Sequence, residues 1–352
     1  MTRRLLVVTT VHPADDPRIR EKHIRTLGVD FDVTYATKAP PPSDTEAIEW
    51  RVLSGGRVAR WFAALRLMLT ARADVIAIHD PELIPAGIVA SVVRRIPVVF
   101  DMHENVPALA RTRVSVPTWL RWPFGVAARG LLAAADRMLV VTVAEAGYGT
   151  LLNSEPPVFP NFLDESRLPE VPTGARSGVI YVGDVTEQRG AVTILKAVAS
   201  VDAGPLTYVG RCSPDLRRTL LEQAAALGVD IELAGWTPHA EAMEMAGSAA
   251  VGVSPLHDLP NYRHSLPTKT LEYLAMGTPV VASDLPGTRA VIGSLPGATL
   301  VPPGGVAALA NALVAVDEDA IAAASAGAPE VRRRFRWPAD EVRTLYASLI
   351  DE

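Results

Sequence analysis

The chain has 352 residues, of which 49% are hydrophobic and 21% charged, and its formal net charge is -5. A chain of this length exceeds the size at which one hydrophobic core stops growing, so two domains are expected. The apolar composition excludes a disordered chain, and the negative balance argues against a nucleic-acid-binding protein. The single cysteine, Cys212, excludes an intrachain disulfide and gives no sign of an oxidising compartment, which favours the cytoplasm.

The beginning of the chain resembles a signal peptide only faintly, because its apolar run over residues 5–11 is short and meets His12-Pro13. We interpret this run as a buried first strand. The longest uncharged apolar stretches, such as residues 83–93, are shorter than the ~20 residues that a membrane span needs. The sequence therefore predicts a chain that does not cross a membrane.

Short β-branched or aliphatic runs alternate with amphipathic helical stretches, which predicts parallel sheets. The runs cover residues 5–9, 31–35, 75–79, 98–101 and 138–143, and then 179–182, 206–209, 231–234, 250–253 and 280–282. A proline-rich stretch over residues 156–177 separates the two groups and predicts a linker. We therefore predict two Rossmann-like, doubly wound α/β domains, residues 1–165 and 166–335, facing a shared cleft. A C-terminal helix over residues 336–352 is expected to pack back on the first domain.

The most informative segment is His264-Ser-Leu-Pro-Thr-Lys-Thr-Leu-Glu272. Pro267 suits a helix start, and Gly277 suits the left-handed residue just past its end. The free amides and dipole of the helix start attract phosphate, and Lys269 adds a positive charge there. Glu272 lies one turn deeper, where its carboxylate can accept two hydrogen bonds from a ribose diol. The plain alternative is a surface pair between Lys269 and Glu272, worth only ~0.2–0.5 kcal/mol.

With these residues the sequence resembles the family 4 glycosyltransferases, retaining enzymes of the GT-B fold, and their exopolysaccharide and lipopolysaccharide-type branch in particular. The resemblance spans nearly the whole chain, and although each motif is weak alone, their order is informative. The motifs are His12-Pro-Ala-Asp-Asp-Pro-Arg-Ile19, His79-Asp-Pro-Glu-Leu83, Phe100-Asp-Met-His-Glu104, Pro160-Asn-Phe-Leu-Asp164, Tyr181-Val-Gly-Asp184 with Arg189-Gly190, and Ser265-Leu-Pro-Thr-Lys269 with Glu272.

The resemblance implies that Glu272 binds the ribose and that Lys269 binds the diphosphate of a nucleotide-sugar donor. Gly183 and Arg189 match a loop that holds phosphate in the family. Gly210 and the turn Gly235-Trp236-Thr237 match positions near the nucleotide, although a glycine after a strand is as often only a turn. The other residues expected at the donor are His264, Leu266, Pro267 and Thr268.

Two positions depart from the family pattern. His264 stands where many members carry a glutamate for the hydroxyls of the donor sugar, which leaves the identity of that sugar open. Asp184 stands where many carry an arginine in the phosphate loop. Either Lys269 and Arg189 compensate for this anion, or Asp184 points away from the phosphates.

In the first domain, Asp101, His103 and Glu104 follow a strand and should lie at its carboxyl end. His103 resembles the active-site histidine of the family, and the alternative is a loop histidine satisfied by backbone groups. Asp16 is equally plausible as a helix N-cap. The residues expected on the acceptor side are Asp15, Asp16, Arg18, His79, Asp80 and Glu104.

No nucleophile with a partnered base and no Asp-x-Asp motif at a strand end can be found, so we expect no metal and no cofactor beyond the donor, a UDP- or GDP-sugar. The resemblance implies front-face retention of configuration. Arg189, Lys269 and helix amides would stabilise the departing diphosphate. The expected catalytic residues are therefore His103, Lys269 and Arg189.

Residues 105–135 contain no acidic side chain, and their cations and aromatic rings alternate. With Arg57 and Arg60 they can form a face for anionic lipid headgroups and a polyprenyl-linked acceptor. The alternative is a core-packed helix with solvated arginines. The first interpretation predicts peripheral contact with the inner face of the plasma membrane. The side chains concerned are Arg111, Arg113, Arg121, Arg129, Trp119, Trp122 and Phe124.

The sequence thus predicts retaining transfer of a sugar from a nucleoside diphosphate to a glycan or lipid-linked acceptor in surface polysaccharide or glycolipid synthesis. One alternative is a sugar-nucleotide epimerase or hydrolase of the same fold. A second is a non-catalytic sugar-nucleotide-binding partner subunit, suggested by His264 and Asp184. A nicotinamide dehydrogenase is disfavoured, because residues 9–16 contain no glycine where a pyrophosphate-binding turn needs several.

Overall fold

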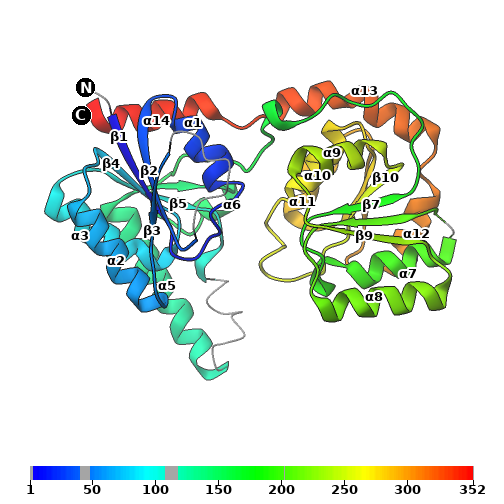
Figure 1. Ribbon diagram of the computed structural model, residues 1–352, viewed down its shortest axis with the longest axis horizontal. Helices are drawn as coiled ribbons and strands as arrows, with labels where there is room; N and C mark the ends of the chain where they lie inside the picture. Colours follow the sequence, from blue (N-terminus) through cyan, green and yellow to red (C-terminus); the bar gives the residue numbers. More distant parts are fainter. Residues whose placement is uncertain (1–2, 40–47, 108–117, 202, 352) are drawn as a thin grey trace. The chain divides into compact units, whose positions relative to one another are not determined.

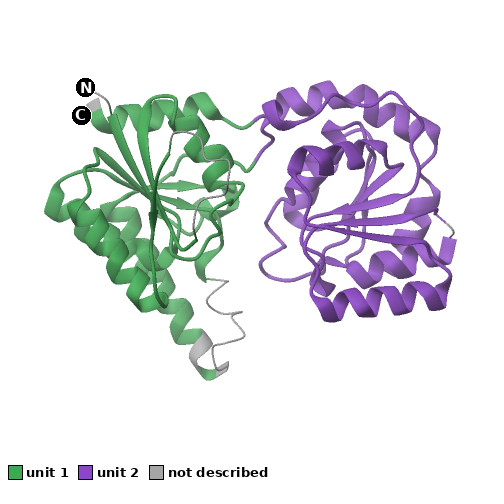
Figure 2. Cartoon of the chain, in the orientation of Figure 1, with its two compact units in different colours: residues 1–161, 337–352 green, residues 162–336 purple. Residues whose placement is uncertain are grey.

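The computed structural model describes residues 3–39, 48–107, 118–201 and 203–351. The chain forms two compact units, residues 1–161 with 337–352 and residues 162–336 (Figure 2). The boundary between the two units, after Asn161, lies inside the proline-rich stretch. Each unit has its own parallel sheet and its own core.

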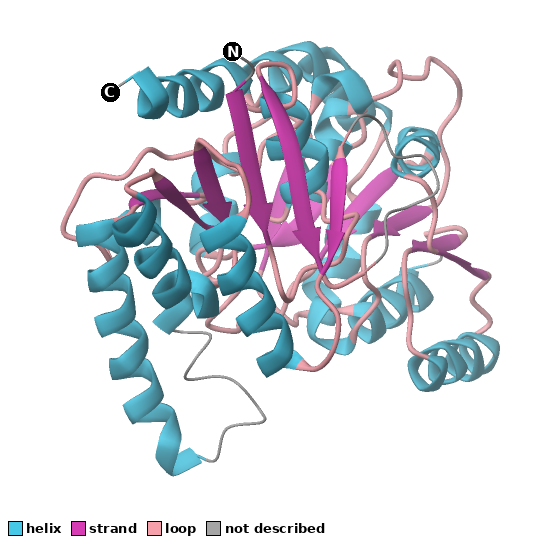
Figure 3. Cartoon of the chain, turned by 60° about the vertical axis from the view of Figure 1, so that its left-hand side comes forward, coloured by secondary structure: helices cyan, strands magenta, loops and turns pink. Residues whose placement is uncertain are grey.

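Unit 1 is a six-stranded parallel sheet in the order β3-β2-β1-β4-β5-β6 (Figure 1). Alternate side chains of β1 point to opposite faces, Leu6 and Val8 to one and Leu5 and Val7 to the other. Helices cover both faces (Figure 3). The strands are β1 (Arg3–Val8), β2 (Phe31–Thr37), β3 (Glu49–Val52), β4 (Val75–Ile78), β5 (Val98–Met102) and β6 (Val140–Val143). One face packs against α2 (Arg57–Thr70), α3 (Ile84–Arg94) and α5 (Thr118–Met138), and the other against η1 (Ile19–Ile24), α1 (Arg25–Leu27) and α14 (Ala339–Asp351). Two short helices, η2 (Pro81–Leu83) and α6 (Ala146–Gly149), follow β4 and β6.

Unit 2 repeats this plan with the strand order β12-β11-β10-β7-β8-β9. Its strands are β7 (Val179–Val182), β8 (Leu206–Val209), β9 (Ile231–Gly235), β10 (Val251–Ser254), β11 (Val280–Ser283) and β12 (Ala298–Val301). One face packs against α7 (Ala191–Val201), α8 (Pro214–Leu227) and α12 (Val306–Val314). The other packs against α9 (His239–Ser248), α10 (Thr268–Ala275), α11 (Pro286–Ile292) and α13 (Glu318–Arg334). The turns η3 (Glu165–Arg167) and η4 (Glu187–Arg189) lie in loops.

The predicted fold class, two Rossmann-like α/β domains, is confirmed. All ten predicted strands are present with shifts of a few residues at their ends. The sequence missed β3 and β12, which both lie at a sheet edge. Three of the four residues of β3 are exposed, so the strand lacks the apolar run that marks a buried strand.

The apolar side chains of α2 are not all buried. Val58 and Phe62 are 71% and 60% exposed, whereas Ala64 and Met68 are fully buried. Only the later turns of the helix pack against the core, so the first turns leave apolar side chains in solvent.

The C-terminal helix α14 packs on unit 1 beside α1 (Figure 1). Trp337, just before it, donates a hydrogen bond from Nε1 to the hydroxyl of Thr26 at 3.0 Å. Arg343 forms a two-pronged ion pair with Asp30, with distances of 2.6 and 3.0 Å. The ring of Tyr346 is fully buried and meets Phe31 edge to face, with 6.4 Å between the ring centroids. The last residues of the chain thus complete the core of unit 1.

Tyr346→Ala should lower the free energy of unfolding by about 3–5 kcal/mol, because it leaves a cavity where a fully buried ring stood. Tyr346→Phe is the matched control. The Tyr346 hydroxyl is buried without a hydrogen-bond partner among the described residues, so removing it should cost no stability. Urea unfolding of both variants checks this, and equal losses would contradict the packing assigned to α14.

Candidate functional site

The first candidate site lies at the carboxyl ends of β1, β4 and β5, three neighbouring strands of unit 1. At its centre is Asp101, a fully buried carboxylate near the end of β5. The Arg18 guanidinium donates to both of its oxygens, at 2.7 and 2.8 Å, and Thr142 donates a third bond at 3.0 Å. Burial alone would raise the pKa of Asp101, but the charge and hydrogen bonds of Arg18 hold it well below its ordinary value.

Asp80, directly after β4, anchors the loop that follows β1. Its carboxylate accepts hydrogen bonds from the hydroxyls of Thr9 and Thr10 and from the backbone N–H groups of Thr10 and Val11. The loop therefore crosses the point where the strand order reverses, between β1 and β4, which is the usual ligand position in such sheets.

Three histidines lie close to Asp101, and a fourth, His12, contacts one of them. His79 Nδ1 lies 3.3 Å from Oδ2 of Asp101, and His23 Nε2 lies 3.6 Å from the same oxygen. Burial lowers the pKa of both rings, that of His23 to about 3, so both are neutral at pH 7. His103 lies near the surface of the cluster, and its Nε2 atom lies 3.1 Å from Nε2 of His12.

The residues expected on the acceptor side divide into two groups. Arg18, His79 and Asp80 are almost completely buried, which favours a supporting role for them. Asp15 and Glu104 are exposed. Asp16 is not the N-cap of η1, which is Arg18, but its Oδ1 accepts from the backbone N–H groups of residues 18 and 19 at the start of that helix. Its Oδ2 contacts His12 at 3.2 Å.

The side chains of His79, Asp101 and His103 offer ligand atoms within 4.8 Å of one another, a spacing that a metal ion would need. Both oxygens of Asp101 are however bonded to the Arg18 guanidinium, whose charge would repel a cation. This arrangement favours a carboxylate neutralised by arginine, and we do not identify these residues as metal ligands.

The second candidate site lies in unit 2, where α10 begins after Pro267. The helix starts at Thr268, one residue later than predicted, and Gly277 has the expected left-handed backbone, with φ +68°. Lys269 stands in the first turn. Its Nζ atom is buried, lies 3.6 Å from the centre of the Tyr181 ring and has no hydrogen-bond partner among the described residues. Burial and the nearby Arg189 hold the pKa of Lys269 well below its ordinary value.

Two glycines let the loops after β7 and β8 come close to Lys269 and to each other. Gly183, after β7, has φ +122°, and a Cβ there would lie 3.0 Å from Lys269 Nζ. Gly210, after β8, has φ +143°, and a Cβ there would lie 2.0 Å from the Gly183 carbonyl oxygen. Both glycines have a left-handed backbone that strains any other residue, so the close approach of the two loops at this point depends on glycine.

Arg189 ends the turn η4, which is capped by the hydroxyl of Thr186. Burial lowers the pKa of Arg189, but Tyr181 and a hydrogen bond with Tyr262 raise it above its ordinary value. Asp184 lies next to Gly183 and forms an exposed ion pair with Arg211, with 3.4 Å between Oδ1 and Nε. The anion that departs from the family pattern thus has a cation of its own.

Glu272 lies one turn after Lys269 and contacts His239 at the start of α9, with 3.0 Å between Oε1 and Nε2. Both side chains keep some exposure, 19% for Glu272 and 30% for His239. The sequence prediction missed His239, although its place directly after the β9 turn could have indicated it. It also missed Tyr181, Tyr262 and a role for His12, which depend on contacts between distant segments.

The remaining residues expected at the donor lie around α10 and β9. Trp236 is 64% exposed, and Thr237 donates to the Gly235 carbonyl at 3.4 Å. Leu266 and Thr268 are half-buried, and His264 is exposed. Gly287 holds the His264 loop, since a Cβ there would lie 2.7 Å from the carbonyl carbon of His264.

The aromatic residues at the beginning of α5 do not pack in the core. Trp119 and Trp122 are 76% and 70% exposed, and Phe124 is 49% exposed, whereas Leu132 and Ala135 further along are fully buried. The core-packed alternative therefore holds only for the later turns of α5. Arg111 and Arg113 lie outside the described residues, as does the Arg121 side chain. Of the other basic residues, Arg57 is paired with Glu82, and Arg60 donates to the carbonyls of residues 10 and 55.

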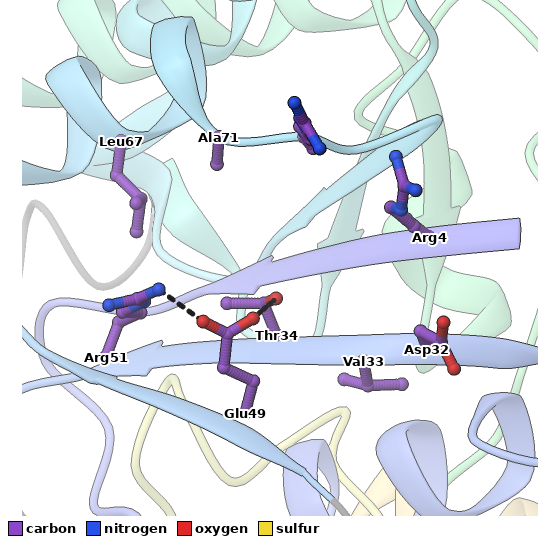
Figure 4. A pocket seen from close by; sticks show the side chains of 9 residues that line it. Arg4, Asp32, Val33, Thr34, Glu49, Arg51, Leu67 and Ala71 are labelled. Atoms are coloured by element: carbon purple, nitrogen blue, oxygen red, sulfur yellow. Dashed lines mark hydrogen bonds and ion pairs between the residues drawn. The ribbon is translucent and has the colours of Figure 1, made fainter.

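A pocket of about 660 Å³ lies elsewhere in unit 1, between the end of α2 and strands β2 and β3 (Figure 4). Glu49 there is bonded to Arg51 and to the hydroxyl of Thr34. None of the predicted site residues lines this pocket. We assign it no function.

Within the described part of the chain, no helix is both long and apolar enough to span a bilayer.

Both units match known families. Residues 3–158 match the family described as "Glycosyl transferase 4-like domain", and residues 176–319 match "Glycosyl transferases group 1". The chain belongs to the family 4 glycosyltransferases. A curated relative of this glycosyltransferase, the phosphatidyl-myo-inositol mannosyltransferase of Mycobacterium leprae (strain TN), is 28% identical over 309 residues, which are 83% of this chain and 76% of the relative.

Solved structures share the GT-B fold of this glycosyltransferase. HepE of Anabaena, in complex with UDP and glucose, has a TM-score of 0.74 at 14% identity and is covered over 99% of both chains. Sucrose-phosphate synthase of Thermosynechococcus elongatus has a TM-score of 0.77 at 18% identity, over 99% of this chain and 100% of the other. WaaG, a glycosyltransferase involved in lipopolysaccharide biosynthesis, has a TM-score of 0.70 at 15% identity, and the match covers 98% of this chain and 99% of WaaG.

The buried neutral histidines should make the glycosyltransferase acid-sensitive. His23 takes up a proton near pH 6.5 when unfolded but only near pH 3 when folded, so the unfolded state binds more protons between these values. Its contribution to stability is therefore complete above pH 6.5 and is lost as the pH falls below it, by up to ~1.4 kcal/mol per pH unit.

Urea unfolding at pH 7.5 and 5.5 measures this loss. His23→Phe should reduce it, because the apolar ring takes no proton, while His257→Gln, in unit 2, serves as the control and should leave it unchanged. An unaltered pH dependence in His23→Phe would show that His23 does not remain neutral in the folded protein.

Proposed function

We propose that this glycosyltransferase transfers a sugar from a nucleoside diphosphate, a UDP- or GDP-sugar, to a glycan or polyprenyl-linked acceptor with retention of configuration, in surface polysaccharide or glycolipid synthesis. Transfer would need no metal ion. The enzyme would act in the cytoplasm, at the inner face of the plasma membrane.

The observation that carries this proposal is the buried ammonium of Lys269. A buried charge normally has a hydrogen-bonded partner, because an isolated one loses its hydration without compensation. The Nζ atom of Lys269 lies over the face of Tyr181 and has no hydrogen-bond partner among the described residues. Arg189 is a second cation nearby, and the carboxylates of Asp184 and Glu272 act on Lys269 without a hydrogen bond to it. An anion bound beside Gly183 and Lys269 would receive hydrogen bonds from both cations and from the first amides of α10. A diphosphate fits this requirement.

The position of Glu272 supports the proposal that the ligand with the diphosphate also carries a nucleoside. It lies one turn beyond Lys269 on α10, and His239 holds one carboxylate oxygen by a 3.0 Å contact. The carboxylate can accept the two hydroxyls of a ribose. HepE, a structural neighbour, binds UDP and UDP-glucose, in line with this donor class.

The chemistry of the proposed reaction follows from the charges. Lys269 and Arg189 would stabilise the negative charge that grows on the diphosphate as the bond to the sugar breaks, and that is where electrostatic catalysis is most effective. A diphosphate oxygen would take the acceptor proton, which needs no protein nucleophile. His103 would contact the sugar.

The exposed aromatic side chains of α5 support an acceptor at a membrane. Trp119, Trp122 and Phe124 stand in solvent at the first turns of the helix, and Val58 and Phe62 do so on α2. Aromatic rings of this kind insert into the interface of a bilayer. Binding to anionic vesicles, lost in a Trp119→Ser, Trp122→Ser double variant with unchanged melting temperature, would support this part of the proposal.

A thermal-shift panel of UDP-, GDP- and dTDP-sugars tests the donor. A bound donor stabilises the fold by ~2.7 kcal/mol at a hundredfold excess over its Kd. NMR of the anomeric proton of the product then tests retention. Turnover of the nucleotide sugar without any acceptor would instead favour the epimerase or hydrolase alternative.

Glu272→Gln should weaken donor binding by about 1–3 kcal/mol, because the ribose hydroxyls lose a charged acceptor. Isothermal titration with the donor selected by the panel measures this change. The control is Glu241→Gln, which removes an exposed carboxylate from α9 in the same unit. Equal affinity in both variants would remove Glu272 from the nucleotide site.

Lys269→Ala should lower kcat by more than it lowers donor affinity, since the ammonium meets charge that is largest in the transition state. Steady-state kinetics at saturating donor, together with titration of the donor, separate the two effects. An intact kcat would exclude a catalytic role for Lys269, whatever its effect on binding.

A further inference from the structure

The contacts of His12 and His103 fix most of the protons on the two rings. A carbonyl oxygen only accepts, so the 3.2 Å contact of His103 Nδ1 with the Asp101 carbonyl needs a proton on that nitrogen. An ionised carboxylate also only accepts, so the 3.2 Å contact of His12 Nδ1 with Asp16 needs a proton there. Both Nδ1 atoms are therefore protonated.

The two Nε2 atoms then face each other at 3.1 Å, an ordinary hydrogen-bond distance. Two bare nitrogens would oppose their lone pairs, and two N–H groups would bring their hydrogens into collision. Only one proton between the two nitrogens satisfies the contact. The four ring nitrogens thus hold three protons, and the pair carries one positive charge.

The surroundings stabilise this charge. Asp80 Oδ1 lies 3.4 Å from His12 Nε2, and Asp101 Oδ2 lies 3.6 Å from His103 Nδ1. Glu104 adds a carboxylate from the segment after β5. The opposing cation is Arg18, which is bound to Asp101, while the rings of His23 and His79 are neutral.

The groups around His12 favour this assignment. Burial alone would lower the pKa of His12, but the hydrogen bond and charge of Asp16, with Asp80 and Glu104, raise it above its ordinary value. The same hydrogen bond helps to hold the pKa of Asp16 well below its ordinary value, against the effect of burial.

We propose that His12 is a positioning residue for His103: the two imidazoles share one proton, which fixes the orientation and tautomer of His103 and gives the pair a single positive charge. His12 reaches this position because Asp80 anchors the β1 loop and Asp16 holds the far side of its ring. The effect of His12 on transfer rests on the proposed function, in which His103 contacts the sugar. The shared proton is independent of the proposed function.

NMR of the enzyme with ¹⁵N-labelled histidine tests the shared proton without any substrate. The signals of the two rings are assigned by their loss in His12→Gln and His103→Gln. At pH 7 we expect protons on both Nδ1 atoms and intermediate shifts for both Nε2 atoms, which report one proton between them. An unprotonated Nδ1 on either ring, or two neutral rings at pH 7, would overturn the proposal.

Asp16→Asn tests the effect of the Asp16 charge on the shared proton while keeping the contacts of this side chain with the backbone. The amide oxygen can still accept from the backbone at the start of η1, as Oδ1 does in the native protein. The variant should keep its melting temperature at pH 8, while the shared proton should be lost at a pH lower by roughly one unit or more. A shared proton that persists to the same pH would show that Asp16 does not stabilise the pair.

Kinetics test the positioning role. His12→Phe should lower kcat by at least about tenfold with little change in the KM of the donor, because a misplaced His103 harms the chemical step most. His12→Gln can still donate to His103 Nε2, so it should recover part of kcat and lose the alkaline decline of the wild-type pH profile. A merely structural His12 would lower the melting temperature of both variants and leave the pH profile unchanged. Absence of transfer in the wild type would refute the proposed function, and the NMR result would still decide the shared proton.

Discussion

The buried carboxylate of Asp101 is the constraint on which unit 1 depends. Removing such a group from water is tolerated only if its hydrogen-bonding capacity is filled, and loss of one partner of a buried ion pair typically costs about 3–5 kcal/mol. Arg18 supplies the opposite charge, and its remaining N–H groups reach the carbonyl of Phe159 at 3.0 Å. Its guanidinium also lies over the ring of Trp337, which precedes α14. Arg18, directly before η1, therefore connects Asp101 on β5 with Phe159 and with Trp337 in front of α14.

Unit 2 contains the opposite electrostatic situation. Whereas Arg18 pairs with the buried Asp101 in unit 1, unit 2 leaves the Lys269 ammonium buried against an aromatic ring without a hydrogen bond from a described residue. Arg189 is a second cation nearby, and the carboxylates of Asp184 and Glu272 only partly offset it. The cost of this arrangement must be offset by the rest of the fold in the absence of a ligand, and an anion would relieve it. A site that is unfavourable when empty and favourable when filled gives binding a strong dependence on the charge of the ligand.

Both sites lie where the order of strands reverses, but they use this place differently. In unit 1, Asp80 accepts hydrogen bonds from the loop after β1 and so holds that loop over the place where the strand order reverses. In unit 2, Gly183 and Gly210 let the loops after β7 and β8 come close to each other and to Lys269 of α10. The same parallel topology thus gives one unit a polar cluster with a histidine pair at its surface and the other a buried lysine at a helix start beside two glycines.

The sequence alone determined the two α/β units, ten of the twelve strands and the helix that carries Lys269 and Glu272, because periodicity, prolines and glycines act locally along the chain. It did not reveal the edge strands β3 and β12, which lack a continuous buried run. It also could not show that Arg18 and Asp80 support the site from inside, that Asp184 pairs with Arg211, or that His12 meets His103 and His239 meets Glu272. Those contacts join residues from 27 to 91 positions apart, so only the packing of the strands into sheets decides them.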